Sequence, residues 1–192
     1  GDLFSQPGNV AIPVNDLFDT ELGKPVDPKT VHGQFLHHRF AGNASDARKA
    51  IQARLKGIAA EPIEGLAASI TRYAVGTACA IAGENRQFVL VALSGADAVT
   101  RQTSVEPHEF VRALFCLWKA VRECCNNQPI SVPLMGNGPS RVKFKPSELA
   151  DLIIMTAIHA YQSTPFASQL SLMLHKDDWA NIDLHQIKRR FG

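Results

Sequence analysis

Residues 130–141 read ISVPLMGNGPSR, a short apolar run that ends in Gly136-Asn137-Gly138. An apolar run of about 4–8 residues bounded by glycines is typical of a strand buried on both faces. A helical pattern begins at residue 146 or 147, with Leu149 and Ile153 on its apolar side. A strand, a glycine turn and a helix in succession form the repeating unit of α/β domains.

The same alternation of short strand-like runs and longer helical runs extends over the whole chain. Strands are predicted over 9–14, 77–81, 88–93, 130–135 and 169–174. Further helices are predicted to begin at Asp27-Pro28, Ser45, Ser104 and Asp183, because Ser and Asp cap helices and Pro suits a first turn. The prediction is four to six strands and five helices in one layered α/β domain over residues 1–192.

Two of the predicted helices carry the widest apolar stripes. Their residues recur at the spacing of one helix face, so we expect both helices to pack on a sheet. The stripes are Phe110, Val111, Leu114, Phe115, Leu117, Trp118 and Val121 in the first, and Leu149, Leu152, Ile153, Ala157 and Ile158 in the second.

The composition bounds the class of protein. With 192 residues, 45% of them hydrophobic, and a net charge of +2, the chain is long enough for a real core and is unlike a disordered segment. The near-neutral charge argues against a strongly basic nucleic-acid binder, so no nucleic-acid partner is expected. The sequence contains no run of about 18 or more apolar residues, so no membrane span is predicted. The cysteines are expected to be reduced, in a cytosolic setting and without a metal: Cys79, Cys116, Cys124 and Cys125.

The glycine loop at Gly136-Asn137-Gly138 is the most specific chemical feature. Glycines at the end of a strand let the backbone approach a ligand, and inward-turned N–H groups suit a phosphate. Arg141 would add a charge-assisted hydrogen bond. The alternative is a tight turn with no ligand. The loop is neither a Rossmann fingerprint nor a P-loop, because the third glycine and the Gly-Lys-Ser/Thr sequence are missing.

Polar residues follow the first predicted strand. Asn15, Asp16 and Asp19 stand at its carboxyl end, where open α/β sheets bind ligands. A turn closed by Asn or Asp side chains is an equally good interpretation. The segment 72–77 (RYAVGT) is a third candidate loop, and a plain bend between strands is its alternative.

The sequence offers little support for catalysis by its own side chains. His32 and His37 are five residues apart and do not form the i, i+4 metal pair. No nucleophile elbow is present, and neither Asp16/Asp19 nor the acidic pair at 177–178 has a spacing that requires acid–base chemistry. No metal and no cofactor are therefore expected.

Taken together, the loops resemble the macro domain family. The segments that carry the resemblance, in order, are GDLF (1–4), IPVNDLFDT (12–20), HGQF (32–35), RYAVGTA (72–78), LVALS (90–94) and PLMGNG (133–138). The pattern is closest to the macro-like ligand-sensing domain of Thoeris antiphage defence effectors, and it spans essentially the whole chain.

The resemblance implies a three-layer α/β/α domain with a mixed central sheet and a cleft for an ADP-ribose-type nucleotide. In the Thoeris branch such a domain senses a signal nucleotide made by a TIR-domain enzyme, with histidine-conjugated ADP-ribose as the candidate here, and switches on a membrane effector. A ligand-driven homo-oligomer is also expected. The residues that the resemblance places at the ligand are Asp2, Asn15, Asp16, Phe18, Asp19, His32, Tyr73, Gly76, Thr77, Gly136, Asn137, Gly138, Ser140 and Arg141.

The departures from the family pattern favour a reader over an enzyme. Asn15-Asp16-Leu17-Phe18 replaces the usual Asn-Ala-Ala-Asn, and the glycine-rich run of de-ADP-ribosylating macro enzymes is missing. Asp16 and Asp19 instead add negative charge suited to a cationic substituent on the ligand. The alternatives are an ADP-ribosyl hydrolase using Asp16, Asp19 or His32, and a purely structural oligomerisation domain.

The position of Asp2 also carries an expectation about the whole protein. A ligand residue this close to Gly1 leaves no room for the strand that usually precedes it. We therefore expect a C-terminal fragment of a longer chain, with transmembrane helices upstream. The domain would then be the cytosolic part of an inner-membrane protein.

Overall fold

A computed structural model describes residues 2–63, 70–138 and 142–191. Its strands and helices appear in the following order: β1 (Asn9–Asn15), α1 (Val31–Phe40), α2 (Ala44–Leu55), β2 (Ala60–Ile63), β3 (Ile70–Tyr73), β4 (Ala78–Ala82), β5 (Gln87–Ala96), β6 (Thr103–Ser104), α3 (Pro107–Cys124), β7 (Ile130–Pro133), α4 (Pro146–Ser163), β8 (Leu170–Met173), the 3₁₀ helix η1 (Lys176–Asn181) and α5 (Leu184–Phe191).

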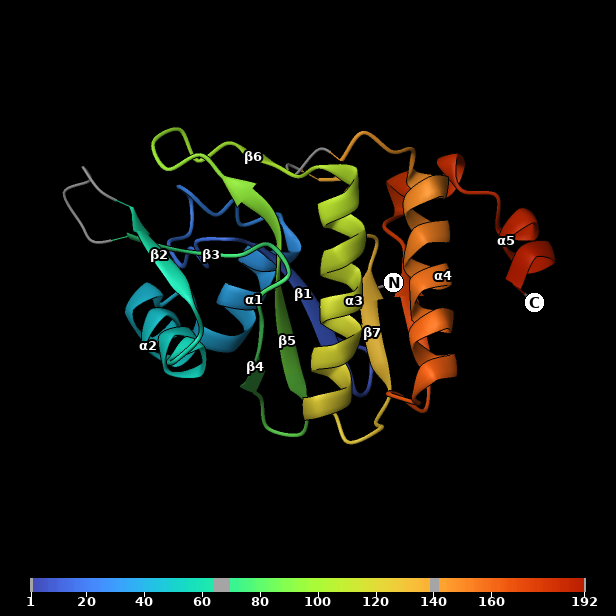
Figure 1. The fold of residues 1–192 in the computed structure, drawn as a ribbon, viewed down its shortest axis with the longest axis horizontal. Helices are drawn as coiled ribbons and strands as arrows, with labels where there is room; N and C mark the ends of the chain where they lie inside the picture. The colour runs from blue at the N-terminus through green and yellow to red at the C-terminus, as the bar shows by residue number, and fades with distance from the viewer. Residues whose placement is uncertain (1, 64–69, 139–141, 192) are drawn as a thin grey trace.

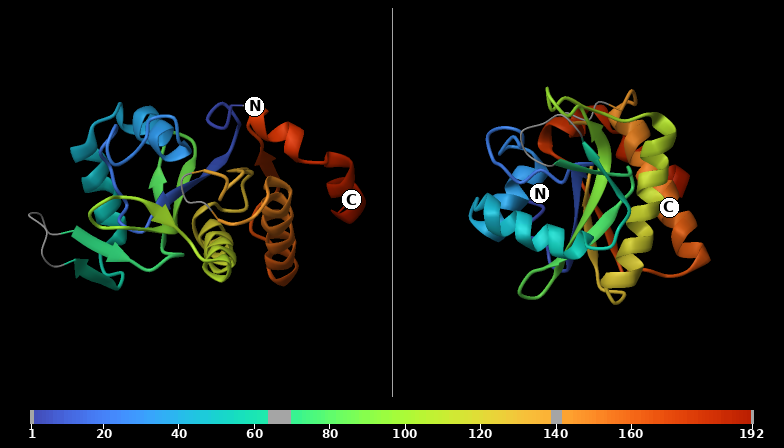
Figure 2. Two further views of the ribbon diagram at one scale, coloured as in Figure 1. Left: turned by 90° about the horizontal axis from the view of Figure 1, so that it is seen from above. Right: turned by 60° about the vertical axis from the view of Figure 1, so that its left-hand side comes forward.

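A mixed sheet forms the middle layer, with the strand order β4-β5-β1-β7-β8. Neighbours from β5 to β8 are parallel, β4 runs antiparallel to β5, and the short β6 pairs with the end of β5. β2 and β3 form a separate antiparallel pair. Figures 1 and 2 show α3 and α4 on one face and α1 and α2 on the other, which confirms the three-layer α/β/α prediction.

Strand β5 explains how one sheet serves two cores. Alternate residues of a strand point to opposite faces. Val89, Val91 and Leu93 join the core under α3 and α4, whereas Phe88 and Leu90 join the core under α1 and α2. The prediction that the apolar run 88–93 is covered on both faces is confirmed, and the strand is longer than predicted.

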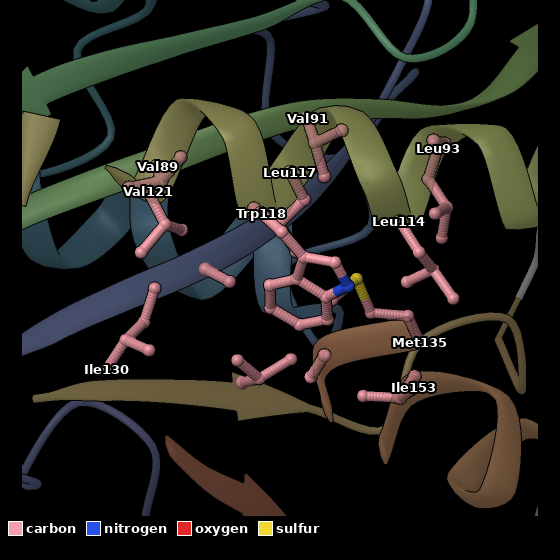
Figure 3. Close-up of a cluster of buried hydrophobic side chains, with 14 of the residues drawn as sticks. Val89, Val91, Leu93, Leu114, Leu117, Trp118, Val121, Ile130, Met135 and Ile153 are labelled. Carbon is pink, nitrogen blue, oxygen red and sulfur yellow. The ribbon is translucent and has the colours of Figure 1, made fainter. Parts of the chain in front are cut away.

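The core under α3 and α4 is built around Trp118 (Figure 3). The indole is fully buried, stacks on Phe166 with ring centroids 5.5 Å apart, and donates a hydrogen bond to Thr156 Oγ1 at 3.0 Å. Phe115 and Ile158, both expected to face the core, are instead exposed by 40% and 39%. Each lies at the edge of the apolar face of its helix, and the residues at the centre of that face already make the contact with the sheet.

Several predicted helix starts are wrong by a few residues. Helix α1 begins after Thr30, whose hydroxyl accepts from Gly33 N, while Asp27 forms the preceding turn. Asn43 rather than Ser45 caps α2. Ser104 lies in β6, and α3 begins at Pro107 without a side-chain cap. A capping side chain must reach a free backbone N–H, and spacing alone did not show which candidate does so.

The described part of the chain holds eight strands, and three of them, β2, β3 and β6, were not predicted from the sequence. β2 and β3 contain no buried residue, and β6 has two residues, so none shows an apolar pattern. Other expectations hold: Asp183 accepts hydrogen bonds from the first turn of α5, and all four cysteines are free thiols. Cys79 and Cys125 are buried and the other two are half-buried.

Candidate ligand-binding site

The candidate site lies at the edge of the sheet where the connections that follow two neighbouring strands run to opposite faces. β1 and β7 are parallel neighbours. The chain leaves β1 for α1 and α2 on one face, and it leaves β7 for α4 on the other. Ligands of open α/β sheets bind at such a switch point, outside the carboxyl ends of the strands. The described residues that follow the two strands at this edge are 16–30, after β1, and 134–138 and 142–145, after β7.

The loop after β1 folds back on itself through Asn15 and Asp19. The Asn15 amide donates to Asp19 Oδ2 at 2.8 Å, and Asp19 N donates to Asn15 Oδ1 at 3.3 Å. Phe18 between them has a left-handed φ of 49° and is buried, with its ring edge-on to Tyr73 at a centroid distance of 5.4 Å. Arg101 lies 3.4 Å from Asp19 Oδ1. The structure thus brings four predicted site residues together: Asn15, Phe18, Asp19 and Tyr73.

Asp16 has a structural role in this loop. Its Oδ1 accepts from Ala96 N at 2.8 Å, and its Oδ2 lies 3.0 Å from Arg72 Nε. Burial raises the pKa of the carboxyl, and the Ala96 hydrogen bond and the Arg72 charge oppose that rise. Because both oxygens have partners, Asp16 ties the ends of β1, β3 and β5 together. A direct contact of Asp16 with a ligand stays a prediction.

His32 is buried in the first turn of α1. Burial lowers the pKa of its imidazole to about 4, opposed by a backbone hydrogen bond with Asp19, so the ring is neutral at pH 7. Its Nε2 has no hydrogen-bond partner among the described residues, and neither has the buried hydroxyl of Thr20. Buried polar atoms without partners are uncommon in folded proteins. These two lie in or beside the loop after β1, and a contact of His32 with a ligand stays a prediction.

The two glycines of the loop after β7 have different surroundings. Gly136 has a φ of +88°, and a Cβ there would lie 3.0–3.1 Å from Leu149, Phe110 and Val142. A Cβ on Gly138 would meet no atom of the described residues within 4 Å. Asn137 donates to Asp178 of η1. Ser140 and Arg141 lie outside the described residues.

Three predicted residues have contacts elsewhere in the fold. Gly76 turns the chain into β4 with a φ of +95°, and a Cβ there would lie 3.0 Å from Cys116 Sγ on α3. Thr77 belongs to the same turn and accepts a backbone hydrogen bond from Ala92. Asp2 accepts from Phe4 N in its own turn near the N-terminus. Their contact with a ligand stays a prediction.

A cavity of about 330 Å³ adjoins the loop after β1 and brings in residues that the sequence did not indicate. Arg48 and Gln52 of α2 and Arg101 line it, together with Asp19 and Tyr73. Arg48 pairs with Glu21 at 2.8 Å. A second hollow of about 500 Å³ lies at Asp16 and Arg72. No spacing in the sequence links α2 to this loop, so only the folded chain reveals the cavity.

Metal binding has no support in the described part of the chain, where no group of three His, Cys, Asp or Glu side chains could hold an ion. No described helix is long and apolar enough to cross a membrane.

The sheet order, the two helical layers and the paired loops define a macro domain. Similar solved structures are the Oceanobacillus iheyensis macrodomain with ADP (14% identity, TM-score 0.60, covering 100% of this chain and 87% of that one) and a glycine-to-valine mutant of it with ADPR (19%, 0.60, 100% and 89%). The macrodomain of Mycobacterium tuberculosis DarG has 15% identity and a TM-score of 0.54, covering 90% of this chain and 92% of that one.

Within this class the chain belongs to a particular family. Residues 1–175 match the family model of the Macro domain of the Thoeris protein ThsA, and the chain is a member of that family. The macro domain resemblance of the loops is thereby confirmed. No curated protein sequence matches the chain.

Proposed function

We propose that this domain is the sensor of a Thoeris effector and binds a signal nucleotide derived from ADP-ribose. The observation that carries the proposal is that the glycine loop and the Asn15–Asp19 loop follow the carboxyl ends of two neighbouring parallel strands, β7 and β1, in a ThsA-type macro domain. Among the described residues, no atom lies within 4 Å of a Cβ placed on Gly138, which supports a close approach of a diphosphate to the backbone there. ADP and ADPR in the similar Oceanobacillus macrodomain support the same ligand class.

We also infer the source and the consequence of the signal. A TIR-domain enzyme makes the nucleotide, and histidine-linked ADP-ribose is the leading candidate. Binding assembles the domain into homo-oligomers and switches on a membrane effector in bacterial antiphage defence. In this proposal the effector is attached to the inner membrane, and the domain stands on its cytosolic side.

A reader fits the side chains better than an enzyme does. Both carboxylate oxygens of Asp16 have protein partners, and Asn15 and Asp19 bond to each other. His32 is buried with a pKa of about 4, which makes it a poor proton acceptor near pH 7. None of the three candidate groups is therefore well suited to acid–base work. The bound nucleotide would leave chemically unchanged.

A thermal melt with added nucleotide tests the proposal. Ligand at about 100 times its Kd adds about 2.7 kcal/mol, which for a chain of this size raises the Tm by roughly 5–10 °C. The panel is ADP-ribose, histidine-linked ADP-ribose, NAD and cyclic ADP-ribose, with light scattering to follow assembly. If neither ADP-ribose nor its conjugate shifts the Tm, the proposal is wrong. Recovery of a cleaved conjugate would instead establish the hydrolase.

A further inference from the structure

The C-terminal segment, residues 176–191, forms a surface that the fold does not use. It consists of η1 and α5 and lies beyond α4 at one end of the molecule (Figures 1 and 2). No residue of α5 is buried, and neither hydrophobic core contains one. Buried Ile182 and an ion pair between Arg190 and Asp151 of α4 attach the segment to the domain. The family match ends at residue 175, before this segment begins.

Large apolar side chains of this segment face solvent. Trp179 is 66% exposed and Leu184 is 58% exposed. Leu184, Ile187 and Phe191 are spaced three and four residues apart and share one face of α5. Ile187 and Phe191 are half-exposed. The apolar face of α5 is therefore left without a protein core to cover it.

The charges at the C-terminal end of α5 are positive, and two of the three have no ion-pair partner among the described residues. Lys188, Arg189 and Arg190 are consecutive, and α5 holds no acidic residue. Lys188 and Arg189 form no ion pair within the described ranges, whereas Arg190 is held by Asp151. The acidic residues of the segment lie before this basic end: Asp177 is exposed in η1, Asp178 accepts a hydrogen bond from Asn137, and Asp183 accepts from the backbone at the start of α5. The positive charge is therefore confined to the last turns of α5.

We propose that residues 176–191 bind the surface of an anionic phospholipid bilayer. A short helix with an apolar face and neighbouring cations lies in the plane of the headgroups, with Trp and Leu side chains below them. Lys188 and Arg189 would then lie at the level of the lipid phosphates. Only the cations at the end of α5 complement the lipid phosphates. The whole chain has a net charge of only +2. The segment contacts the glycine loop of the proposed nucleotide site through the hydrogen bond from Asn137 to Asp178. The lipid-binding proposal rests on the exposed face of α5 and not on the proposed function.

Vesicle co-sedimentation of the whole 192-residue chain tests this. Vesicles of phosphatidylcholine with about 30% phosphatidylglycerol should bind the protein at least ~10-fold more strongly than pure phosphatidylcholine, since each cation near the surface contributes about 1 kcal/mol. Binding should fall as the salt rises from ~0.05 to ~0.5 M, because the Debye length shortens.

Matched variants separate this segment from general surface effects. Leu184→Glu should abolish binding, whereas Val99→Glu, at a site exposed by 77% in another part of the molecule, should not change it. Lys188→Glu with Arg189→Glu should weaken binding at least about thirty-fold. Lys119→Glu with Arg122→Glu, at exposed cations of α3, should weaken it far less. All these positions are exposed, so the variants should fold, and circular dichroism checks that they do.

Three outcomes would overturn the proposal. One is equal binding to neutral and anionic vesicles, and another is an equal loss of binding in the control variants. The third is no vesicle binding together with self-association that Leu184→Glu removes, because the surface would then bind a second copy of this chain instead.

Discussion

Gly136 and Gly138 stand two residues apart in one loop, yet their surroundings differ. Gly136 adopts a left-handed φ, and a Cβ on it would lie within 3.0–3.1 Å of Leu149, Phe110 and Val142, so this glycine is required by the fold. Gly138 is exposed, and no atom of the described residues lies within 4 Å of the place that its Cβ would take. A side chain at Gly138 would therefore affect a ligand before it affected the protein.

The pair predicts opposite effects for the same substitution. Gly138→Val should reduce the affinity for an ADP-ribose-type ligand by at least ~100-fold with little change in stability, because the added side chain occupies the open side of the loop. Gly136→Val should lower the free energy of unfolding by more than ~2 kcal/mol, through both strain and overpacking. Calorimetry and urea unfolding measure the two effects. Unchanged affinity in Gly138→Val would remove the phosphate-loop assignment.

His32 makes the stability of the domain depend on pH. Burial lowers the pKa of its imidazole from 6.5 to about 4. Between pH 4 and pH 6.5, His32 therefore binds a proton in the unfolded chain but not in the folded chain. The contribution of the neutral ring is complete above about pH 6.5 and is lost as the pH falls toward 4.

A comparison with His32→Gln isolates this effect. From pH 7 to about 4.5, the free energy of unfolding of the wild type should fall by about 2–3 kcal/mol more than that of His32→Gln. The comparison removes the contribution of Asp16, whose raised pKa acts in the opposite direction. His37→Gln, at an exposed site on α1, is the control and should follow the wild type. Parallel pH curves for wild type and His32→Gln would contradict the assignment.

At the scale of elements, α3 and α4 are joined by one buried hydrogen bond. Trp118 Nε1 donates to Thr156 Oγ1, and that hydroxyl also lies within hydrogen-bond distance of the carbonyls of Leu152 and Ile153 on its own helix. The indole is fully buried and stacks on Phe166, and the described residues offer its N–H no other acceptor. The relative position of the two helices therefore depends on this contact.

Thr156→Val should destabilise the domain by about 1–3 kcal/mol, because it leaves the buried indole N–H without a partner. Thr164→Val, at the exposed end of α4, is the control and should cost less than ~0.5 kcal/mol. Urea unfolding followed by Trp fluorescence measures both. If Trp118→Phe and Thr156→Val together cost the full sum of the single changes, the two side chains are not coupled.

At the scale of the whole molecule, the central sheet couples two cores. Leu90 and Val91 are neighbours on β5, both fully buried, and they point into different clusters. β1 and β5, which lie side by side in the sheet, supply residues to both faces. Loss of either core should therefore expose the strands that the other core needs.

Leu90→Ala and Val91→Ala should both lower the temperature of one shared unfolding transition. The expected cost is about 2–5 kcal/mol for Leu90→Ala and about 1–3 kcal/mol for Val91→Ala, through lost burial and the cavities left behind. Calorimetry should show one peak in each variant. Two separate transitions would mean that the faces unfold independently.

The sequence itself predicted the α/β class, the five helices, the buried strands and the glycine turn after β7. Those features follow from local periodicity and from glycines at strand ends, and the ordered loops were enough to indicate the family. Helix caps were harder, as Ser45 and Ser104 show, because several polar residues compete for each helix start.

Only the tertiary structure decided what each polar residue contacts. Asp16 and Asp19 are three residues apart and look alike in sequence, yet Arg72 and Ala96 hold the first while Asn15 and Arg101 hold the second. Arg48 and Gln52 joined the edge of the site through the packing of α2. The physical reason is that hydrogen bonds and ion pairs join residues far apart in the chain. Periodicity predicts on which face of a helix or strand a residue lies. The partner of that residue depends on how the layers of the fold pack together.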